Sequence, residues 1–369
     1  MVIGIDASRA NLAHKTGTEW YSFFVIQELK KIIPTEHRII VYSRDPLQGE
    51  LAQLPSHWSS VVLNWPPRVL WTQLRLSAEL LVHRIDVLYV SAHTLPLIGG
   101  KKNVAVIHDV GFFRNTALYS KLELAYHRLA FFLALKKSNT IITISQFSAS
   151  EITALSPTSA TAKKLSVIHN GFVRRTVPVN AQQRVEQLNL TRPYILTLGR
   201  VEEKKNMLRC VESFARVLQD TQWGGDLVCV GAFGYGAERI RTRAQELGIL
   251  GRVHFLEWQD EETVAALLSC ADMFYFPTLY EGFGMPVIEA LDMGIPVVCS
   301  DIPPLKEIAQ DAAVFFDPFD VTAMSHAVSS VISERVDARN ERIARGKKVA
   351  QRFSWRETAE KTWSLIERT

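Results

Sequence analysis

The sequence predicts an α/β protein built from two Rossmann-like domains that face each other across a cleft. Short apolar runs of strand type alternate with helical patterns along almost the whole chain, as expected for folds with parallel sheets. A polar stretch over residues 173–192, rich in Arg, Gln and Asn, interrupts this alternation and has the composition of a linker. The 369 residues are enough for two domains. We therefore expect domains over residues 1–175 and 186–352.

Each element of the first half is predicted from its apolar pattern. Buried runs predict strands over residues 2–6, 38–43, 61–64, 85–91, 103–110 and 141–145, before residues 165–172 close the domain. Helical spacing predicts helices over residues 19–31, 71–83 and 121–137, and Ser145 is expected to cap a further helix. The helix over residues 121–137 is apolar around much of its girth and has Lys at both ends. It is either a buried helix or a contact with a bilayer.

The second half repeats the alternation. Apolar runs predict strands over residues 194–199, 226–230, 253–258, 271–277, 295–300 and 314–318. Helices are predicted from residue 207, over residues 286–294 and 321–336, from residue 340 onward, and in the tail over residues 353–369. The glycine-rich turn after residue 230 lacks an acidic residue at the interval typical of dinucleotide sites, so we do not expect NAD.

The stretch EGFGMPVIE at residues 281–289 follows a predicted strand and enters a helix whose first turn contains Pro286. Its two glycines let the backbone approach a ligand, and the start of a helix attracts anions. Glu281 and Glu289 can both face the end of the strand, where their carboxylates would accept hydrogen bonds from sugar hydroxyls. The simpler interpretation is a capped helix start with a solvated second carboxylate.

Other charged and polar residues also follow predicted strands. Arg200 and Lys205 come after the strand at residues 194–199, where two cations could neutralise a diphosphate or form a solvated charge cluster. His108 ends the strand at residues 103–110, a position that suits either a structural histidine or a substrate contact. Gly17 lies in a Thr-Gly-Thr loop between a strand and a helix, which is weak evidence for phosphate binding.

Composition limits the function classes. Residues 1–170 contain 18 Lys and Arg against 11 Asp and Glu, a net charge of +7, whereas the remainder contains 24 against 27, a net charge of −3. Because no basic helix or basic-aromatic platform occurs, we exclude nucleic acid and favour a phosphate-rich substrate or an anionic membrane, or else an uneven surface without a partner. The four cysteines are scattered in apolar settings. With no leader and no spanning run, we expect a cytoplasmic protein.

Taken together, these motifs resemble the retaining glycosyltransferases of family four, which have the GT-B fold. The likeness is carried by Gly199-Arg200 with Lys204-Lys205-Asn206, and by the paired glutamates of residues 281–289. Weaker agreement comes from residues 106–109, 144–148, 167–172 and 353–355. The opening of the first domain and the helix over residues 71–83 resemble bacterial O-antigen mannosyltransferases.

The resemblance implies a role for each site residue in binding a nucleoside diphosphate sugar. Glu289 would hold the ribose hydroxyls, Glu281 would contact the donor sugar, and Arg200 and Lys205 would bind the diphosphate and stabilise it as a leaving group. His108 would touch the transferred sugar. The backbone of Phe283, Gly284 and Met285 would reach the sugar or phosphate, and Gly17 would approach the donor phosphate. Many relatives have a glycine pair in place of Thr16-Gly17.

The resemblance further implies front-face attack by the acceptor, with retention of configuration. The sequence has no DxD motif, which predicts a reaction independent of metal and of any bound cofactor. The expected acceptor is a glycan or a polyprenyl-linked glycan used in cell-surface or lipopolysaccharide synthesis, at the inner face of a membrane. The first candidate donor is GDP-mannose, and UDP-hexoses are the next. The helix over residues 353–369 is expected to pack back on the first domain.

Two other functions stay open on this fold. A nucleotide-sugar epimerase or hydrolase would need acid-base carboxylates in the first domain, where Asp6, Glu19 and Asp109 are the candidates. A non-catalytic sugar or nucleotide binding protein would bind the donor without turnover.

Overall fold

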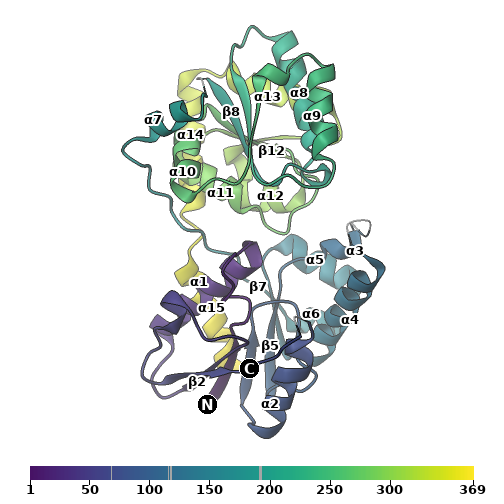
Figure 1. The fold of residues 1–369 in the computed structure, drawn as a ribbon, viewed down its shortest axis with the longest axis vertical. Coiled ribbons are helices and arrows are strands. Elements are labelled where there is room, and N and C mark those ends of the chain that lie inside the picture. The colour runs from purple at the N-terminus through teal and green to yellow at the C-terminus, as the bar shows by residue number, and fades with distance from the viewer. Residues whose placement is uncertain (68, 115, 117–118, 191–192) are drawn as a thin grey trace. The chain divides into compact units, whose positions relative to one another are not determined.

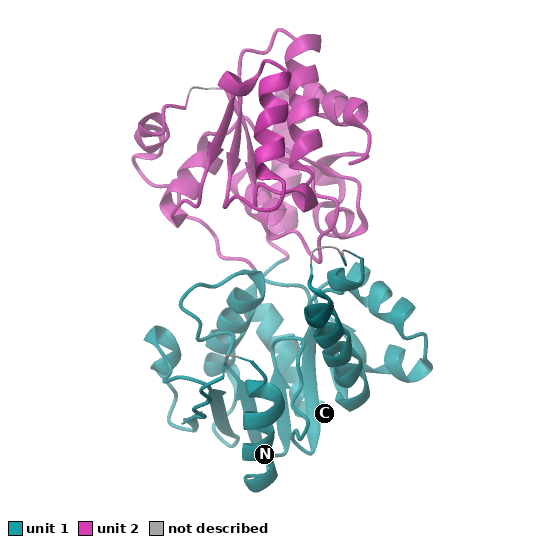
Figure 2. Ribbon diagram, turned by 45° about the vertical axis from the view of Figure 1, so that its right-hand side comes forward, with its two compact units in different colours: residues 1–171, 353–369 teal, residues 172–352 magenta. Residues whose placement is uncertain are grey.

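The computed structural model describes residues 1–67, 69–114, 116, 119–190 and 193–369. The chain divides into two units, coloured separately in Figure 2: unit 1 comprises residues 1–171 and 353–369, and unit 2 comprises residues 172–352. Each unit is built on one parallel sheet whose strands alternate with helices. The prediction of two Rossmann-like α/β halves is therefore confirmed.

Unit 1 contains a parallel sheet with the strand order β3-β2-β1-β4-β5-β6-β7. Its strands are β1 (Val2–Asp6), β2 (Arg38–Ser43), β3 (Trp58–Val62), β4 (Val87–Val90), β5 (Lys102–Ile107), β6 (Thr140–Thr143) and β7 (Leu165–Val167). The order turns back between β1 and β4, so the carboxyl ends of these two strands flank a topological switch point, where open α/β sheets bind ligands.

The helices of unit 1 pack in two groups (Figure 1). They are α1 (Gly17–Ile32), η1 (Gly49–Ala52), the π-helix η2 (Trp71–Leu76), α2 (Ser77–Val82), α3 (Gly111–Arg114), α4 (Lys121–Lys137), α5 (Gln146–Leu155), α6 (Ser159–Lys164) and α15 (Trp355–Arg368). Side chains of η2, α2 and α4 share one apolar core with the strands. The C-terminal helix α15 packs on α1, where the Trp355 ring stacks on Phe24 with ring centroids 5.3 Å apart.

Unit 2 contains a parallel sheet in the order β10-β9-β8-β11-β12-β13. Its strands are β8 (Tyr194–Leu198), β9 (Asp226–Val230), β10 (Val253–Leu256), β11 (Met273–Phe276), β12 (Val297–Ser300) and β13 (Ala313–Phe316). The switch point of this sheet lies between β8 and β11.

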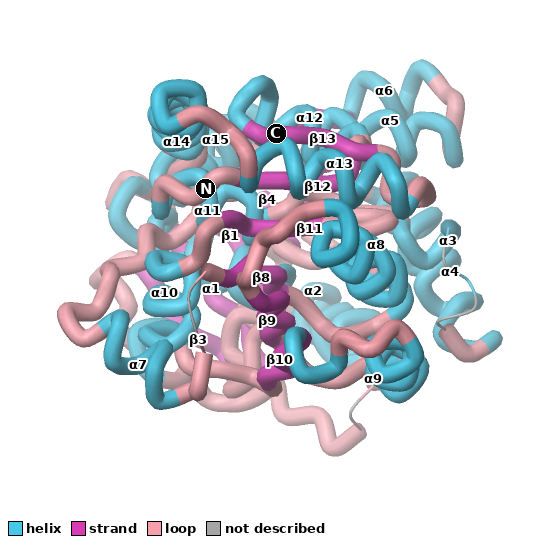
Figure 3. The backbone as a smooth tube through the Cα atoms, turned by 90° about the horizontal axis from the view of Figure 1, so that it is seen from above, coloured by secondary structure: helices cyan, strands magenta, loops and turns pink. Residues whose placement is uncertain are grey.

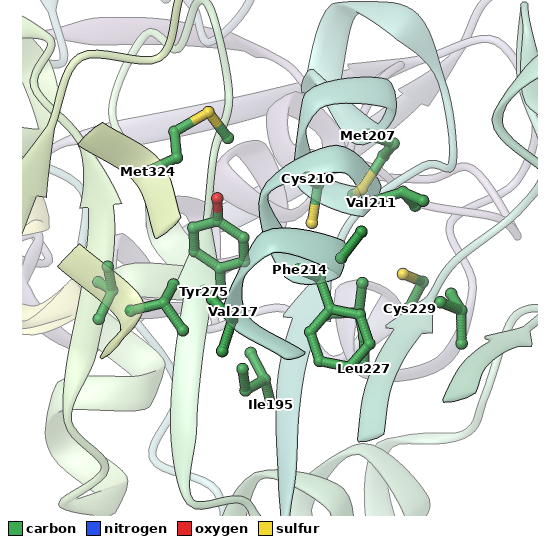
Figure 4. Packing of buried hydrophobic residues seen from close by; sticks show 14 of the residues in the cluster. Ile195, Met207, Cys210, Val211, Phe214, Val217, Leu227, Cys229, Tyr275 and Met324 are labelled. Atoms are coloured by element: carbon green, nitrogen blue, oxygen red, sulfur yellow. The ribbon is translucent and has the colours of Figure 1, made fainter. Parts of the chain in front are cut away.

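Helices cover both faces of the sheet of unit 2, as Figure 3 shows, with α8, α9 and α13 on one side and α10, α11 and α14 on the other. The helices are α7 (Ala181–Gln187), η4 (Glu203–Lys205), α8 (Met207–Asp220), α9 (Ala237–Glu246), η5 (Leu250–Arg252), α10 (Glu261–Cys270), α11 (Met285–Met293), α12 (Pro303–Ala309), η6 (Gln310–Ala312), α13 (Val321–Ile332) and α14 (Val336–Ala350). Met207, Cys210 and Phe214 of α8 belong to the same buried core as Ile195 and Leu227 of the strands (Figure 4). This packing fixes the loop between β8 and α8.

Several predicted boundaries are wrong for physical reasons. Strand β3 begins at Trp58 rather than at residue 61, because it pairs with β2 from Ile39↔Trp58 to Ser43↔Val62. The predicted linker over residues 173–192 contains α7, whose Ala181 and Val185 are buried where this helix packs on α10. A mainly polar composition does not exclude a helix when a few apolar residues find a tertiary partner.

Helix boundaries differ in two further places. Residues 71–83 begin as the π-helix η2 before α2, and π-helical turns are frequent at functional sites. Helix α13 ends at Ile332 and α14 begins at Val336, so the predicted helix over residues 321–336 is too long and the next begins earlier than residue 340.

Candidate functional site

Two glycines bring the ends of β8 and β9 into backbone contact. Gly199 and Gly231 have φ values of +143° and +148°, a region that side chains with a Cβ rarely adopt. A Cβ on Gly231 would lie 2.3 Å from the carbonyl oxygen of Gly199. The Gly199 N–H donates to the Val230 carbonyl at 3.0 Å, and the Val201 N–H donates to the Ala232 carbonyl at 3.0 Å. The loop that carries Arg200 and Lys205 is therefore held by the loop that follows β9.

An ion pair joins two predicted site residues across the switch point of unit 2. Lys205 follows β8, Glu281 follows the neighbouring strand β11, and the Lys205 Nζ atom contacts Glu281 Oε1. Both side chains are mostly buried, and Nζ lies 5.7 Å from the centroid of the Phe276 ring, within cation–π distance. The structure therefore places a cation and a carboxylate together at the strand ends.

Asn206 fixes the position of Lys205. It ends η4 in the left-handed conformation, with φ +59°, and begins α8. Its side chain is buried, and its Nδ2 atom donates to the Pro318 carbonyl at 2.7 Å, while its Oδ1 atom accepts from Arg209 at 3.1 Å. Asn tolerates this backbone region better than most residues, and the side-chain bonds stabilise it there. The cation of Lys205 is thus presented from a rigid turn.

Arg200 has a different environment from Lys205. Its guanidinium Nε lies 3.3 Å from Glu202 Oε2, and 63% of its side chain is exposed. The structure therefore brings Lys205, but not Arg200, into an ion pair with Glu281. An exposed guanidinium on the same loop can still change its rotamer to meet an incoming anion.

The turn before α11 is shaped by Gly284. This residue has φ +115°, and a Cβ there would lie 2.5 Å from Leu305 Cδ2 and 2.8 Å from Ile308 Cδ1. Phe283 is buried, and Met285 is the first residue of α11, with Pro286 next to it in the first turn. As predicted, Gly294 ends the helix in the left-handed conformation with φ +75°. The positive end of the α11 dipole lies directly after the Glu281 loop.

The carboxylate of Glu289 is bound by an arginine that the sequence analysis missed. Arg175 Nε and Nη2 donate to Glu289 Oε2 at 3.1 and 3.0 Å, and both side chains are mostly buried. Burial raises the pKa of Glu289 above its usual value, and the Arg175 charge opposes this rise. The neighbouring Arg174 lies 3.6 Å from Asp292 on the same helix. The signal in the sequence was the arginine pair inside the predicted linker.

In unit 1, His108 follows β5 and is buried near the switch point. Its Nε2 atom lies 2.9 Å from the Ser91 carbonyl oxygen after β4, so Nε2 carries the proton and donates. Its ring contacts Tyr21 edge-on at 4.7 Å and lies 5.4 Å from the His93 ring. Burial lowers the pKa of His108, and burial together with the nearby His108 lowers the pKa of His93 to about 3. Both imidazoles are therefore neutral near pH 7.

Gly17 is the first residue of α1, in a loop fixed by its neighbours. The Thr16 N–H donates to Glu19 Oε2 at 3.1 Å in a capping box, and Glu19 Oε1 lies 3.4 Å from Arg9 Nη1. A Cβ on Gly17 would meet nothing within 4 Å. Neither packing nor backbone conformation therefore requires glycine at this position.

The three carboxylates that an acid-base function would need in the first domain all have structural contacts. Asp6 Oδ1 accepts from the Ser8 N–H at 2.9 Å, and Asp109 Oδ1 accepts from the Gly111 N–H at 2.8 Å, while Glu19 caps α1. Such turn and capping bonds are common local uses of a carboxylate. These contacts disfavour an epimerase or hydrolase based on these residues.

Neither a metal cluster nor a membrane span is found among the described residues. No group of three or more His, Cys, Asp or Glu side chains in the described part of the chain is arranged to hold a metal ion. None of the helices described is long and apolar enough to cross a bilayer. The four cysteines are buried and not in disulfides, and burial raises the pKa of Cys229 to about 12.

Two family models match consecutive parts of the chain. Residues 17–173 match the model described as Glycosyltransferase Family 4, and residues 179–349 match the model described as Glycosyl transferases group 1. Together they cover most of both units.

Similar proteins of known name include several mannosyltransferases. The O-antigen chain mannosyltransferase B of Escherichia coli is 27% identical over 259 residues, which cover 69% of this chain and 67% of that protein. O-antigen chain mannosyltransferase RfbU of Salmonella typhimurium is 25% identical over 255 residues, with coverage of 69% and 67%. The serotype-specific mannosyltransferase WbdA of Escherichia coli is 26% identical over 267 residues, which cover 70% of this chain but only 32% of that protein.

Solved structures of similar fold cover essentially the whole chain. Sucrose-phosphate synthase from Thermosynechococcus elongatus has a TM-score of 0.74 at 19% identity, covering 100% of this chain and 98% of that one. WaaG, a glycosyltransferase of lipopolysaccharide biosynthesis, has a TM-score of 0.73 at 16% identity, with 99% of both chains covered. HepE of Anabaena, in complex with UDP and glucose, has a TM-score of 0.74 at 18% identity and covers both chains fully. At these identities the likeness shows the fold alone.

Proposed function

Because the chain belongs to the family 4 and group 1 glycosyltransferases, which have the GT-B fold, we propose that it transfers a hexose from a nucleoside diphosphate sugar to a glycan or polyprenyl-linked acceptor. The first candidate donor is GDP-mannose, since the named relatives at 25–27% identity are O-antigen mannosyltransferases. UDP-hexoses are the alternative, because the structural neighbour HepE was solved with UDP-glucose. The Lys205–Glu281 ion pair carries the proposal.

The ion pair suits a donor that combines a diphosphate with a sugar. Lys205 is held over the Phe276 ring at the switch point, next to the loop that begins α11. A diphosphate placed there would meet a fixed ammonium, a helix start and, after a rotamer change, the guanidinium of Arg200. The Glu281 carboxylate beside it would accept hydrogen bonds from hydroxyls of the attached sugar. One small region would thus bind both parts of the donor.

The same groups would stabilise the leaving group. In the proposed reaction, the acceptor hydroxyl oxygen forms a bond to the anomeric carbon while the bond from that carbon to the diphosphate oxygen breaks. The acceptor proton passes to the departing phosphate, and configuration is retained by attack on the same face. Negative charge that develops on the diphosphate is stabilised by Lys205, Arg200 and the α11 start. Because these charges are supplied by the protein, and the sequence has no DxD motif, we propose that neither a metal nor another cofactor is needed.

Glu289 and His108 have proposed binding roles. The Glu289 carboxylate would bind the two ribose hydroxyls of the nucleotide, with Arg175 holding it in place and favouring its charged form. For His108 we propose contact with the transferred sugar. Its protonated Nε2 is engaged by Ser91, so its Nδ1 atom would be the hydrogen-bond acceptor.

Release of nucleotide from GDP-mannose and UDP-glucose, with and without a polyprenyl-linked acceptor, tests this function. Removing Lys205 should lower kcat by about 10²- to 10³-fold, the range typical for one group that stabilises transition-state charge. Lys204→Ala is the matched control, since it changes the neighbouring residue of the same type in the same turn. Normal turnover in both Lys205→Ala and Glu281→Ala would contradict the proposal. Product formation without an acceptor would instead indicate a hydrolase or epimerase.

A further inference from the structure

One side of helix α4 exposes large apolar side chains to solvent. Leu122 is 85% exposed, Leu129 is 69% exposed, Phe132 is 48% exposed and Tyr126 is 37% exposed. Their spacing of four, three and three residues places them along one side of the helix. The opposite side supplies Phe131, Ala134 and Leu135 to the core of unit 1. Helix α4 is therefore apolar on both its core side and its outer side.

Two neighbouring segments extend this exposed apolar surface. Val69, Leu70 and Leu74 are exposed at the start of η2, whose Gln73 Nε2 atom donates to Tyr126 Oη at 2.8 Å. Leu97 and Ile98 are also exposed. The Leu97 carbonyl accepts from Lys137 Nζ at the end of α4, and the Ile98 N–H donates to Ser77 Oγ of α2 at 3.2 Å. We call these nine apolar side chains, from α4, η2 and residues 97–98, the docking face.

Positive charge accompanies the docking face. Lys121, Arg128 and Lys136 of α4 are all exposed. The acidic residue of the same helix, Glu123, accepts from the Ser120 N–H at 2.8 Å as part of a capping box, on the flank of the helix away from Arg128. Unit 1 as a whole has 21 Lys and Arg against 14 Asp and Glu, a net charge of +7.

We propose that the docking face binds the surface of an anionic lipid bilayer. Exposed Leu and Phe next to Lys and Arg is the combination by which a helix lies in the interface, with its apolar side chains among the acyl chains and its cations at the phosphates. The described helices are not suited to crossing a bilayer, so the contact is peripheral. This binding goes beyond the proposed glycosyl transfer and does not depend on which sugar is moved.

Sedimentation with lipid vesicles tests the docking face on the full chain, without donor or acceptor. We expect binding to vesicles of phosphatidylcholine mixed with phosphatidylglycerol and little binding to phosphatidylcholine alone. Leu122→Ser/Leu129→Ser should weaken the partition constant by about tenfold for each leucine, the effect of withdrawing one large apolar side chain from lipid. Lys121→Gln/Lys136→Gln should weaken it by about fivefold for each lysine, and added salt should reproduce this loss.

A matched control and the size of the protein in solution keep the test decisive. Val62→Ser/Val336→Ser removes two exposed apolar side chains outside the docking face and should leave vesicle binding unchanged. Equal binding of the leucine variant and the wild type, with unchanged melting temperatures, would overturn the proposal. A dimer in sedimentation velocity that Leu129→Ser dissociates would also overturn it, because the face would then be covered by a second copy. Since no glycosyl transfer is measured, these outcomes are separate from failure of the proposed function.

Discussion

The two units share an architecture but place opposite kinds of chemistry at their switch points. In unit 2 the strand ends carry charged groups in close pairs, with Lys205 bound to Glu281 and Glu289 bound to Arg175. In unit 1 the corresponding place holds His108, which is buried and neutral and is bonded to the Ser91 carbonyl. Unit 2 is thus arranged to bind charge, and unit 1 to present neutral hydrogen-bonding groups.

Net charge follows the opposite order. Unit 2 has 21 Lys and Arg against 24 Asp and Glu, a net charge of −3, whereas unit 1 has a net charge of +7. The anion site that we propose therefore lies in the unit with the negative total, because fixed groups at a strand end act within a few ångströms, while distant surface charges are screened. The positive total of unit 1 fits a different role, in which many exposed cations meet an extended anionic surface.

The contrast between the two units can be tested most strongly at their glycines. Gly231→Ala would force a Cβ to within 2.3 Å of the Gly199 carbonyl oxygen at a φ of +148°. We expect it to destabilise unit 2 by about 3 kcal/mol or more and to abolish transfer, because backbone atoms on both sides must move. Calorimetry of the full chain measures the shift of the unfolding transition.

Gly17→Ala is the control in unit 1 for the same substitution. Its Cβ would meet nothing within 4 Å, and alanine favours the helix that begins there, so the melting temperature should stay within about 2 °C of the wild type. Equal melting temperatures for Gly231→Ala and Gly17→Ala would show that the loops after β8 and β9 are not rigidly joined.

Much of this fold was predictable because burial leaves a direct record in the sequence. Strands β1, β4, β8 and β12 are continuous apolar runs, and α4 was predicted with its observed bounds, residues 121–137, from helical spacing and flanking lysines. Edge strand β3 was misplaced because its burial alternates, and only pairing with β2 sets its register. Helix α7 was missed because its stability comes from packing on α10.

The candidate site was only partly accessible from sequence. Strand-end positions and turn residues drew attention to Arg200, Lys205, Glu281 and Glu289 as separate motifs. The ion pair between Lys205 and Glu281 spans 76 residues of sequence, and that between Arg175 and Glu289 spans 114. Such pairs depend on strand order and on loop conformation, which local patterns do not record. For the same reason the exposure of α4 could not be separated from burial before its neighbours were known.

The pH dependence of stability should separate the two units at a smaller scale. Burial lowers the pKa values of His93, His108 and His127, all in unit 1, below the ordinary value of about 6.5. Native unit 1 then binds fewer protons than its unfolded chain below pH 6.5, so its stability falls as pH decreases, by about 1.4 kcal/mol per pH unit for each full proton. Calorimetric scans between pH 7.5 and pH 5.5, which is above the ordinary pKa range of carboxylates, should show the unit 1 transition moving down.

A His93→Gln variant is the matched test of that dependence. Gln keeps a polar side chain of similar length but does not titrate, so the unit 1 transition should depend less on pH than in the wild type. An unchanged slope would mean that the buried histidines do not control the acid stability of unit 1.

The smallest expected effect concerns Arg175, the cation that unit 2 adds behind Glu289. Burial raises the pKa of Glu289 and Arg175 opposes the rise, so Arg175→Ala should raise that pKa further and leave more of the carboxyl protonated at neutral pH. A protonated carboxyl accepts ribose hydrogen bonds less well, and we expect the donor KM to increase by about tenfold, with kcat nearly unchanged. The increase should be largest near pH 6 and shrink toward pH 8, where the carboxylate is restored.

The sign of the accompanying stability change is fixed by the same shift. Because native Glu289 holds its proton more tightly than the unfolded chain does, its contribution to stability decreases as pH rises above about 4.5, and more steeply so without Arg175. Arg174→Ala is the control, since that side chain is 64% exposed and lies 3.6 Å from Asp292 rather than against Glu289. A lower donor KM in Arg175→Ala would show that Arg175 competes with the ribose for Glu289 instead of positioning it.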